Sequence, residues 1–213
     1  SAFGGVLVAN RPIDVATARE IDKLFLEVLI APDFEAEALT ILEGKKNRIL
    51  LRQKEAIDAR WSYRSMLGGV LAQETDRAVE TTAEMKPVTK VAPTAEELTD
   101  LVFATKLVKH SKSNAIVLSK GGQLIASGVG QTSRVDALKQ AIEKARHFGF
   151  DLKGAVLASD AFFPFDDCVT LAAEAGITAI AQPGGSVRDA DSIAAADRLG
   201  VAMVMTGVRH FKH

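Results

Sequence analysis

The sequence predicts an α/β protein with three layers, in which helices cover both faces of a largely parallel sheet. Short, nearly continuous apolar segments at 155–158, 177–181 and 201–205 are typical of strands buried on both faces. Segments with helical periodicity lie between them, and several begin with capping residues. This alternation requires a three-layer αβα arrangement, and 213 residues suffice for one large domain or two modest ones.

Residues 52–93 are the less periodic part of the chain. The segment 68–73 predicts a strand, and the polar run after it is typical of a connector that ends at Pro93. We therefore divide the chain into residues 1–93 and 94–213. The other elements expected in the first part are strands at 6–9, 28–32 and 49–51, a helix that begins after Asp14 and carries Phe25, and a helix from Asp33 to about Gly44.

Residues 94–213 follow a more regular pattern. Thr94 and Glu97 have the spacing of a capping box, and the Gly121-Gly122 pair between two apolar segments is a hairpin signature. The expected elements are a helix from 94 to about 109, strands at 115–119 and 123–127, a helix from 133 to 149, a strand at 155–158, a helix at 167–175, a strand at 177–181, a helix from 186 to 200 and a strand at 201–205.

Composition excludes several classes of protein. A formal net charge of −1 and a pI near 6.4 argue against a general nucleic-acid binder. The single cysteine, Cys168, excludes an internal disulfide framework and fits a reducing compartment. We expect Cys168 to be a small packing residue on a helix. Apolar runs are too short for a membrane span, so we expect a soluble, cytoplasmic protein. The chain starts at Ser1 in the approach to a strand, and we expect a fragment or a processed product.

Four segments that follow apolar strands are candidates for a binding site, because strand-end loops of α/β folds gather at one edge of the sheet. In one of them, Gly184 and Gly185 leave room for a ligand near the backbone, and Ser186 would open a helix suited to polar or anionic groups. A tight turn that needs glycine explains the same residues. The four segments are 128–134, 159–167, 182–186 and 206–213.

The segment 159–167 places three phenylalanines around Pro164 at the end of a strand. Such rings could form a wall for a flat heterocycle, with Asp166 and Asp167 as hydrogen-bond acceptors for its nitrogens. A hydrophobic plug that ties the loop to the core is the alternative.

Cationic residues gather at the end of the chain, and an asparagine precedes a buried strand. Arg209, Lys212 and two histidines lie within five residues and could bind a phosphate or carboxylate, although a solvated basic tail is the alternative. Asn114 could contact an amide or ring edge, or could be a turn residue.

Taken together, these motifs resemble the transformylase part of a bifunctional purine biosynthesis family, which joins phosphoribosylaminoimidazolecarboxamide formyltransferase to IMP cyclohydrolase. The resemblance extends over essentially the whole chain and is to the C-terminal part of the transformylase domain. The segments that carry it are 1–5, 30–32, 112–117, 130–134, 159–165, 182–186 and 209–213.

The resemblance implies formyl transfer from 10-formyltetrahydrofolate, a cosubstrate, to the exocyclic amine of aminoimidazole carboxamide ribonucleotide (AICAR). On the folate side, Asp167 would accept hydrogen bonds from the pterin. On the ribonucleotide side, many relatives carry Asp in place of Glu27. Positions matching the ribonucleotide contacts are Gly4, Glu27, Asn114, Arg134, Phe162 and Arg209, and those matching the folate contacts are Val135, Asp167, Ser186 and Val187.

The family fold consists of tandem units that resemble cytidine deaminase, and the first unit would be incomplete in this chain. The deaminase zinc ligands, His-x-Glu and Pro-Cys-x-x-Cys, are missing from the sequence, and no catalytic metal is expected. Residues 1–93 would be the remainder of the first unit with its connector, and residues 94–213 the second unit. A homodimer with shared sites is implied.

The family's proton transfer relies on an adjacent Lys-His pair that would lie before Ser1, as would the cyclohydrolase domain. Lys109-His110 aligns instead with the approach to Asn114 and is not that pair. The resemblance therefore implies no catalytic residue in this chain, which we expect to be inactive alone. A non-catalytic nucleotide-binding module and a dimerisation module are the alternatives.

Overall fold

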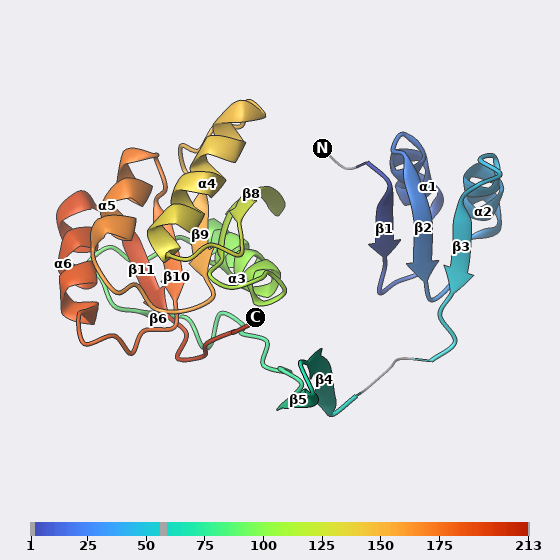
Figure 1. Cartoon of the computed structure of the whole chain (residues 1–213). Coiled ribbons are helices and arrows are strands. Elements are labelled where there is room, and N and C mark those ends of the chain that lie inside the picture. Colours follow the sequence, from blue (N-terminus) through green and yellow to red (C-terminus); the bar gives the residue numbers. More distant parts are fainter. Residues whose placement is uncertain (1–2, 56–58, 213) are drawn as a thin grey trace. The chain divides into compact units, whose positions relative to one another are not determined.

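The computed structural model describes residues 3–55 and 59–212, which belong to two compact units, Ser1–Thr75 and Asp76–His213 (Figure 1). The two are called unit 1 and unit 2 below, and each is described by itself. The residues of the expected connector from Asp76 onwards belong to unit 2. The assignment of residues 1–93 and 94–213 to two deaminase-like units stays a prediction.

Unit 1 contains a three-stranded parallel sheet with the order β1-β2-β3. The Asp14 carboxylate accepts a hydrogen bond from the Thr17 amide at 2.7 Å and so caps α1, as the sequence predicts. The helix is shorter than expected, because it ends at Asp22 and Phe25 leads into the next strand. The elements are β1 (Gly5–Val8), α1 (Val15–Asp22), β2 (Leu26–Ala31), α2 (Ala36–Glu43) and β3 (Ile49–Arg52).

The two faces of this sheet differ in their cover. Leu29 and Leu42 are buried in a cluster where α1 and α2 meet one face of the sheet. On the opposite face Val8 and Leu51 are exposed, and both pair in register with Ile30 between them. Within the described residues, unit 1 therefore has two layers, and the predicted third layer is absent from it.

A two-stranded antiparallel sheet completes unit 1. Its strands are β4 (Trp61–Met66) and β5 (Gly69–Glu74), and every residue of both is exposed. The sequence predicts β5 but misses β4, because Arg64 and two serines interrupt its apolar residues.

Unit 2 contains a six-stranded sheet with the order β6-β11-β10-β9-β7-β8. Strands β9, β10 and β11 are parallel, but β7 runs antiparallel to β8 and β9, and β6 runs antiparallel to β11. The prediction of a largely parallel sheet therefore holds for β1-β2-β3 in unit 1 but is wrong for unit 2, where β7 lies antiparallel between β8 and β9. The strands are β6 (Lys86–Pro87), β7 (Ile116–Lys120), β8 (Gln123–Gly128), β9 (Val156–Ser159), β10 (Ala179–Gln182) and β11 (Ala202–Met205).

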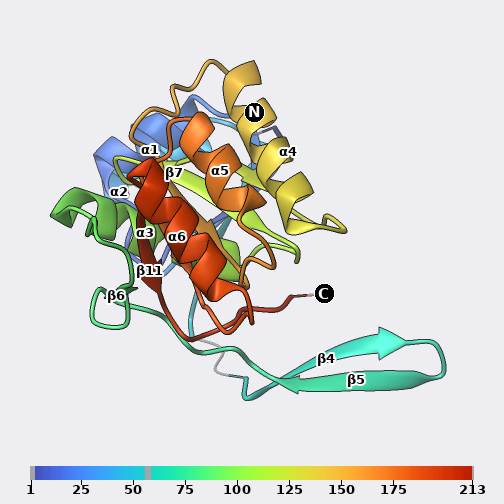
Figure 2. The same ribbon diagram turned by 90° about the vertical axis from the view of Figure 1, so that its left-hand side faces the viewer.

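Helices cover both faces of the unit 2 sheet, which confirms the three-layer prediction for this unit. Leu157 points into the cluster formed with α4, α5 and α6, whereas its neighbours Val156 and Ala158 point into the cluster formed with α3. Figure 2 shows α4, α5 and α6 on the side of the sheet that faces the viewer. The helices are α3 (Ala95–Lys109), α4 (Arg134–His147), α5 (Asp167–Glu174) and α6 (Asp189–Leu199).

Capping residues begin two of these helices as the sequence predicts. Thr94 and Glu97 form a reciprocal capping box at α3, and the Ser133 side chain accepts a hydrogen bond from the Asp136 amide at α4. Ser186 does not open α6, however. Its hydroxyl accepts from the Arg188 amide at 3.1 Å, and the helix begins only at Asp189. The hydroxyl therefore stabilises a turn before the helix rather than the helix itself.

Candidate functional site

The loops that carry most of the predicted site residues leave the unit 2 sheet at one edge. Strands β8, β9, β10 and β11 share one direction, since β7 is antiparallel to both β8 and β9. The loops after these four strands therefore begin at the same edge. Asn114 precedes β7, which runs the other way, so it lies at this edge too.

Arg134 and Asp160 form a buried ion pair at this edge. Arg134 is the first residue of α4, and its Nη2 donates to Asp160 Oδ1 at 2.7 Å. Asp160 is fully buried, and its carboxylate also accepts from the Ser113 hydroxyl at 2.5 Å and the Ala115 amide at 3.1 Å. Sequence reasoning assigned no role to Asp160. A carboxylate directly after a predicted buried strand, in a segment predicted to carry ligand contacts, was the available signal.

Arg209 and Phe162 meet where three of the loops converge. The Arg209 guanidinium carbon lies 4.6 Å from the centroid of the Phe162 ring, and Nη2 donates to the Gly185 carbonyl at 3.4 Å. Gly185 has φ +92°, and an added Cβ would lie 3.0 Å from Arg209 Nη2. Glycine thus serves both the backbone conformation and the close approach of the arginine.

The Phe-rich turn supports both of its interpretations, each at a different residue. Phe163 is fully buried in the core, as a plug would be. Phe162 is half-buried beside Arg209, and Phe165 is half exposed with Arg188 5.1 Å from its ring centroid. The turn therefore fastens the loop through one ring and presents two others at the surface.

The residues predicted for the folate side lie at the start of α4, at the start of α5 and in the loop before α6. Val135 is half-buried against the core, while Val187 is fully exposed. Asp167 is exposed, and its Oδ1 accepts from the Cys168 amide at 2.7 Å. Burial raises the pKa of the Cys168 thiol to about 12, so this thiol remains protonated at neutral pH and packs in the core as expected.

Asn114 ties two of the loops together. Its Nδ2 donates to the Gln131 carbonyl at 2.9 Å, and the backbones of the two residues also pair. The peptide bond before Asn114 is cis. The Asn114 side chain therefore has a structural partner in the loop that leads to Arg134, which supports the interpretation of Asn114 as a turn residue. A contact between Asn114 and an amide or ring edge of a ligand stays a prediction.

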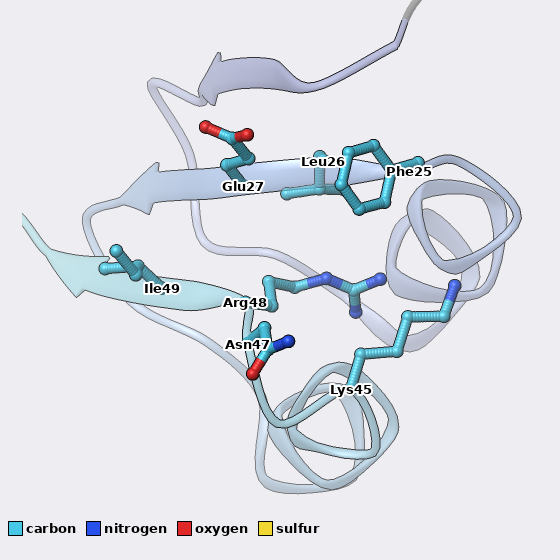
Figure 3. Close-up of a pocket in the computed structure, with 7 residues that line it drawn as sticks. All are labelled: Phe25, Leu26, Glu27, Lys45, Asn47, Arg48 and Ile49. Atoms are coloured by element: carbon cyan, nitrogen blue, oxygen red, sulfur yellow. The ribbon is translucent and has the colours of Figure 1, made fainter.

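Gly4 and Glu27 lie next to each other in unit 1. Gly4 has φ +66°, and a Cβ added there would lie 3.7 Å from Glu27 Oε1. Glu27 also lines a pocket of about 370 Å³, in which Arg48 is almost fully buried and donates to Asp22 Oδ1 at 3.0 Å. In Figure 3 the Glu27 carboxylate projects from β2, while the basic side chains come from the turn before β3. The pocket is lined by Phe25, Leu26, Glu27, Lys45, Asn47, Arg48 and Ile49.

Residues 3–55 and 59–212 contain no cluster of three His, Cys, Asp or Glu side chains that could hold a metal ion. In the same part of the chain, no helix has both the length and the apolar character needed to cross a membrane.

The fold and the site define an α/β protein in which loops at one edge of the sheet present Arg209 and the ring of Phe162. A family model described as the AICARFT/IMPCHase bienzyme matches residues 1–144. The chain belongs to this family, and the resemblance found in its motifs is thereby confirmed.

Over the aligned residues, three curated relatives are 51% to 63% identical to this chain. It is 63% identical over 213 residues to the bifunctional purine biosynthesis protein PurH of Bacteroides thetaiotaomicron, covering 100% of this chain and 42% of the relative. Identity is 54% to PurH of Thermoanaerobacter sp., with 100% and 41% covered, and 51% to PurH of Aquifex aeolicus, with 100% and 42% covered. The chain thus spans about 42% of the length of such relatives.

Solved structures give weaker likenesses. A Thermotoga maritima diaminohydroxyphosphoribosylaminopyrimidine deaminase/reductase matches with a TM-score of 0.35 and 24% identity, covering 51% of this chain and 34% of that one. The dCMP deaminase of cyanophage S-TIM5 matches with a TM-score of 0.36 and 19% identity, covering 46% and 88%. Both TM-scores are too low to assign a fold.

Proposed function

We propose that this chain is part of an AICAR transformylase of de novo purine biosynthesis, which transfers a formyl group from 10-formyltetrahydrofolate to the amine of AICAR. The observation that carries the proposal is the placement of Arg209 over Phe162 at the edge where Arg134 is fixed by Asp160. An exposed guanidinium beside an aromatic ring suits a ligand that combines a phosphate with a flat heterocycle.

The ribonucleotide contacts proposed in unit 2 differ in how firmly they are held. Arg134 is oriented by a buried carboxylate and also donates from Nη1 to the Phe162 carbonyl at 3.4 Å, so it supports the aromatic turn directly. Arg209 is exposed and presents its remaining donors to an anion. Asn114 is proposed to contact the base from the neighbouring loop. Roles for Gly4 and Glu27, which lie in unit 1, stay predictions from the family resemblance.

The folate contacts follow from the chemistry of a pterin, which has an apolar ring face and several hydrogen-bond donors. Val135 and Val187 offer apolar contact, and the exposed Asp167 carboxylate is proposed to accept from the pterin nitrogens. Ser186 adds a hydroxyl in the loop before α6. No resident metal or cofactor enters the proposal.

We propose that the full protein contains tandem deaminase-like units and that the first is incomplete in this chain. The exposed apolar face of the unit 1 sheet supports this, because faces of this kind are covered in folded proteins. This chain covers 42% of the length of the PurH relative from Bacteroides thetaiotaomicron, which agrees with a longer full protein. A homodimer with shared sites and a cytoplasmic location are proposed from the family and from the single buried cysteine.

A non-catalytic ligand-binding or dimerisation module is the second candidate, and the state of Lys109-His110 favours it for the isolated chain. Lys109 is buried, and its ammonium donates to the Ala78 carbonyl at 2.5 Å, so it is not free to act on a substrate. Burial, together with the charges of Lys212 and Lys109, lowers the pKa of His110. We propose that neither residue replaces the family's catalytic pair.

The two candidates are separated by calorimetric titration of AICAR into the chain and its Arg134→Ala variant, combined with a formylation assay that includes 10-formyltetrahydrofolate. We expect AICAR to bind the chain, binding to be lost in the variant, and formylation to be negligible. Robust formylation by residues 1–213 would refute the inactive state. Equal binding by both proteins would refute the role of Arg134, and no binding by either would favour the dimerisation module.

A further inference from the structure

His210 lies between two carboxylates contributed by a distant part of the chain. Its Nδ1 is 2.6 Å from Asp76 Oδ2, and its Nε2 is 2.8 Å from Glu80 Oε1. Both His210 and Glu80 are almost fully buried, with 2% and 3% of their surface exposed. The segment 76–80, called the strap below, is thereby fastened to the end of the chain. Sequence reasoning treated His210 only as one member of a basic segment.

The hydrogen-bonding capacity of the three side chains indicates the charge on His210. An ionised carboxylate only accepts, so an imidazole between two of them must donate from both ring nitrogens. His210 is then a cation. Lys109 supplies a second positive charge, with Nζ 3.6 Å from Asp76 Oδ1, and the buried cluster is electrically balanced by Asp76 and Glu80.

The groups around the cluster favour this distribution of charge. Burial of Asp76 opposes its ionisation, but the hydrogen bond to His210 and the charges of His210 and Lys109 outweigh burial and lower the pKa of Asp76. His110, at the end of α3, is another nearby titratable group, and its pKa is lowered by burial and by the charges of Lys212 and Lys109. The Asp76 carboxylate of the strap thus remains ionised at neutral pH.

His210 is also the inner anchor of the residues that carry Arg209. The Gly207 amide donates to the Pro183 carbonyl at 3.0 Å, and the His210 amide donates to the Asp160 carbonyl at 2.9 Å. Only Val208 and Arg209 lie between these two anchors. Because His210 points into the protein while Arg209 is exposed and lies over Phe162, the inward side chain fixes the direction of its outward neighbour.

We propose that His210 is a positioning residue for Arg209, and that the strap carboxylates Asp76 and Glu80 hold it in place. Through this contact the strap sets how strongly Arg209 binds the anionic group of its ligand. The inference rests on the proposed function only for the identity of that ligand. The placement of Arg209 by His210 is a property of the chain without ligand.

Nuclear magnetic resonance of the arginine side chains tests the placement in the complete 213-residue chain. The Arg209 Nε–Hε signal is assigned by its loss in Arg209→Lys, and the ring current of Phe162 should shift it from the signals of exposed arginines. In His210→Gln and Glu80→Gln we expect this shift to collapse and Hε exchange to accelerate about tenfold or more, because a local anchor is lost. Amide exchange in β9 reports whether each variant is still folded.

His147→Gln is the matched control, because it removes an exposed histidine at the end of α4, about 20 Å along the helix from Arg134. It should leave the Arg209 signal unchanged. If His210→Gln does not fold, Asp76→Asn gives the milder perturbation, since the amide keeps the shape of the carboxylate. An unchanged Arg209 signal in any folded variant of the cluster would overturn the inference.

Calorimetric titration with AICAR separates this inference from the proposed function. If the chain binds AICAR and Arg209→Ala does not, we expect His210→Gln to weaken binding about tenfold or more, consistent with the loss of a charge-assisted contact. Equal affinity of His210→Gln and the unchanged chain would overturn the inference. Equal affinity of Arg209→Ala and the unchanged chain would instead refute the role of Arg209, while the arginine signals would still decide whether His210 places it.

Discussion

The guanidinium of Arg134 donates to the fully buried carboxylate of Asp160 at 2.7 Å, and this pair joins the start of α4 to the loop after β9. Arg134 also donates to the carbonyl of Phe162 in that loop. The same Asp160 accepts from Ser113, whose amide donates to the Lys212 carbonyl at the end of the chain. One carboxylate therefore connects three of the segments that carry predicted ligand contacts.

Asp160→Asn should destabilise unit 2 strongly, because it leaves the buried Arg134 charge without its counterion. Breaking a buried ion pair from one side costs about 3–5 kcal/mol. Asp191→Asn is the control, since Asp191 pairs with Arg188 at 2.6 Å where both side chains are about half exposed, and such pairs contribute about 0–1 kcal/mol. Amide hydrogen exchange in β9 and β10 measures the loss. Similar small effects of both substitutions would contradict the importance of the buried pair.

Gly185→Ala should weaken AICAR binding as well as stability. The residue has φ +92°, and the new methyl group would lie 3.0 Å from Arg209 Nη2. Gly122→Ala introduces a comparable positive-φ strain, at +70°, where a Cβ meets open space. We expect each variant to lose about 1 kcal/mol or more of stability, but only Gly185→Ala to lose affinity in calorimetry. Equal affinities of the two variants would show that Gly185 does not act through Arg209.

Cys168 should resist alkylation in the folded chain even at mildly alkaline pH. Burial raises the pKa of its thiol to about 12, so the reactive thiolate is scarce and the sulfur is inaccessible. Iodoacetamide labelling measured by mass spectrometry should be slow in the native chain and fast in urea. Rapid labelling of the native chain, with β9 amides still protected from exchange, would contradict this burial.

Acid should loosen the strap before it unfolds the rest of unit 2. The pKa of Asp76 is lowered from an ordinary value of 3.8, so its contribution to stability is present above that value and is lost as pH falls through the lower folded-state pKa. Protection from amide exchange at residues 76–80, corrected for the intrinsic pH dependence of exchange, should therefore fall below about pH 4, the ordinary range for aspartate. Asp76→Asn should show weak protection already at neutral pH. Corrected protection in the unchanged chain that does not depend on pH in this range would contradict the prediction.

The two faces of the unit 1 sheet should respond differently to substitution. Val8 is 70% exposed, so Val8→Thr should change stability by less than about 0.5 kcal/mol. Leu29 is 1% exposed, so Leu29→Ala should cost about 2–5 kcal/mol. Amide exchange in β2 measures both. A loss in Val8→Thr as large as that in Leu29→Ala would mean that another molecule covers this face in solution.

Local sequence signals predicted elements whose causes are themselves local. Thr94 and Glu97 satisfy each other across one helical turn, and the Gly121-Gly122 turn closes a hairpin, so both are found where expected. The apolar runs around Leu157 and Ile180 mark strands covered on both faces. Where the local pattern was weaker, the sequence prediction failed: it missed strand β4, and it placed the start of α6 at Ser186 instead of Asp189.

The sequence by itself determined the family, the α/β class and the positions of the strand-end loops, because periodicity, capping and ordered motifs are properties of neighbouring residues. Only the tertiary structure decided the direction of β7 relative to β9, the burial of Asp160 against Arg134 and the hydrogen bonds of His210 with Asp76 and Glu80. Those two carboxylates lie 134 and 130 residues before His210. Such partners are chosen by the packing of distant segments, and their attraction depends on burial, which no local pattern encodes.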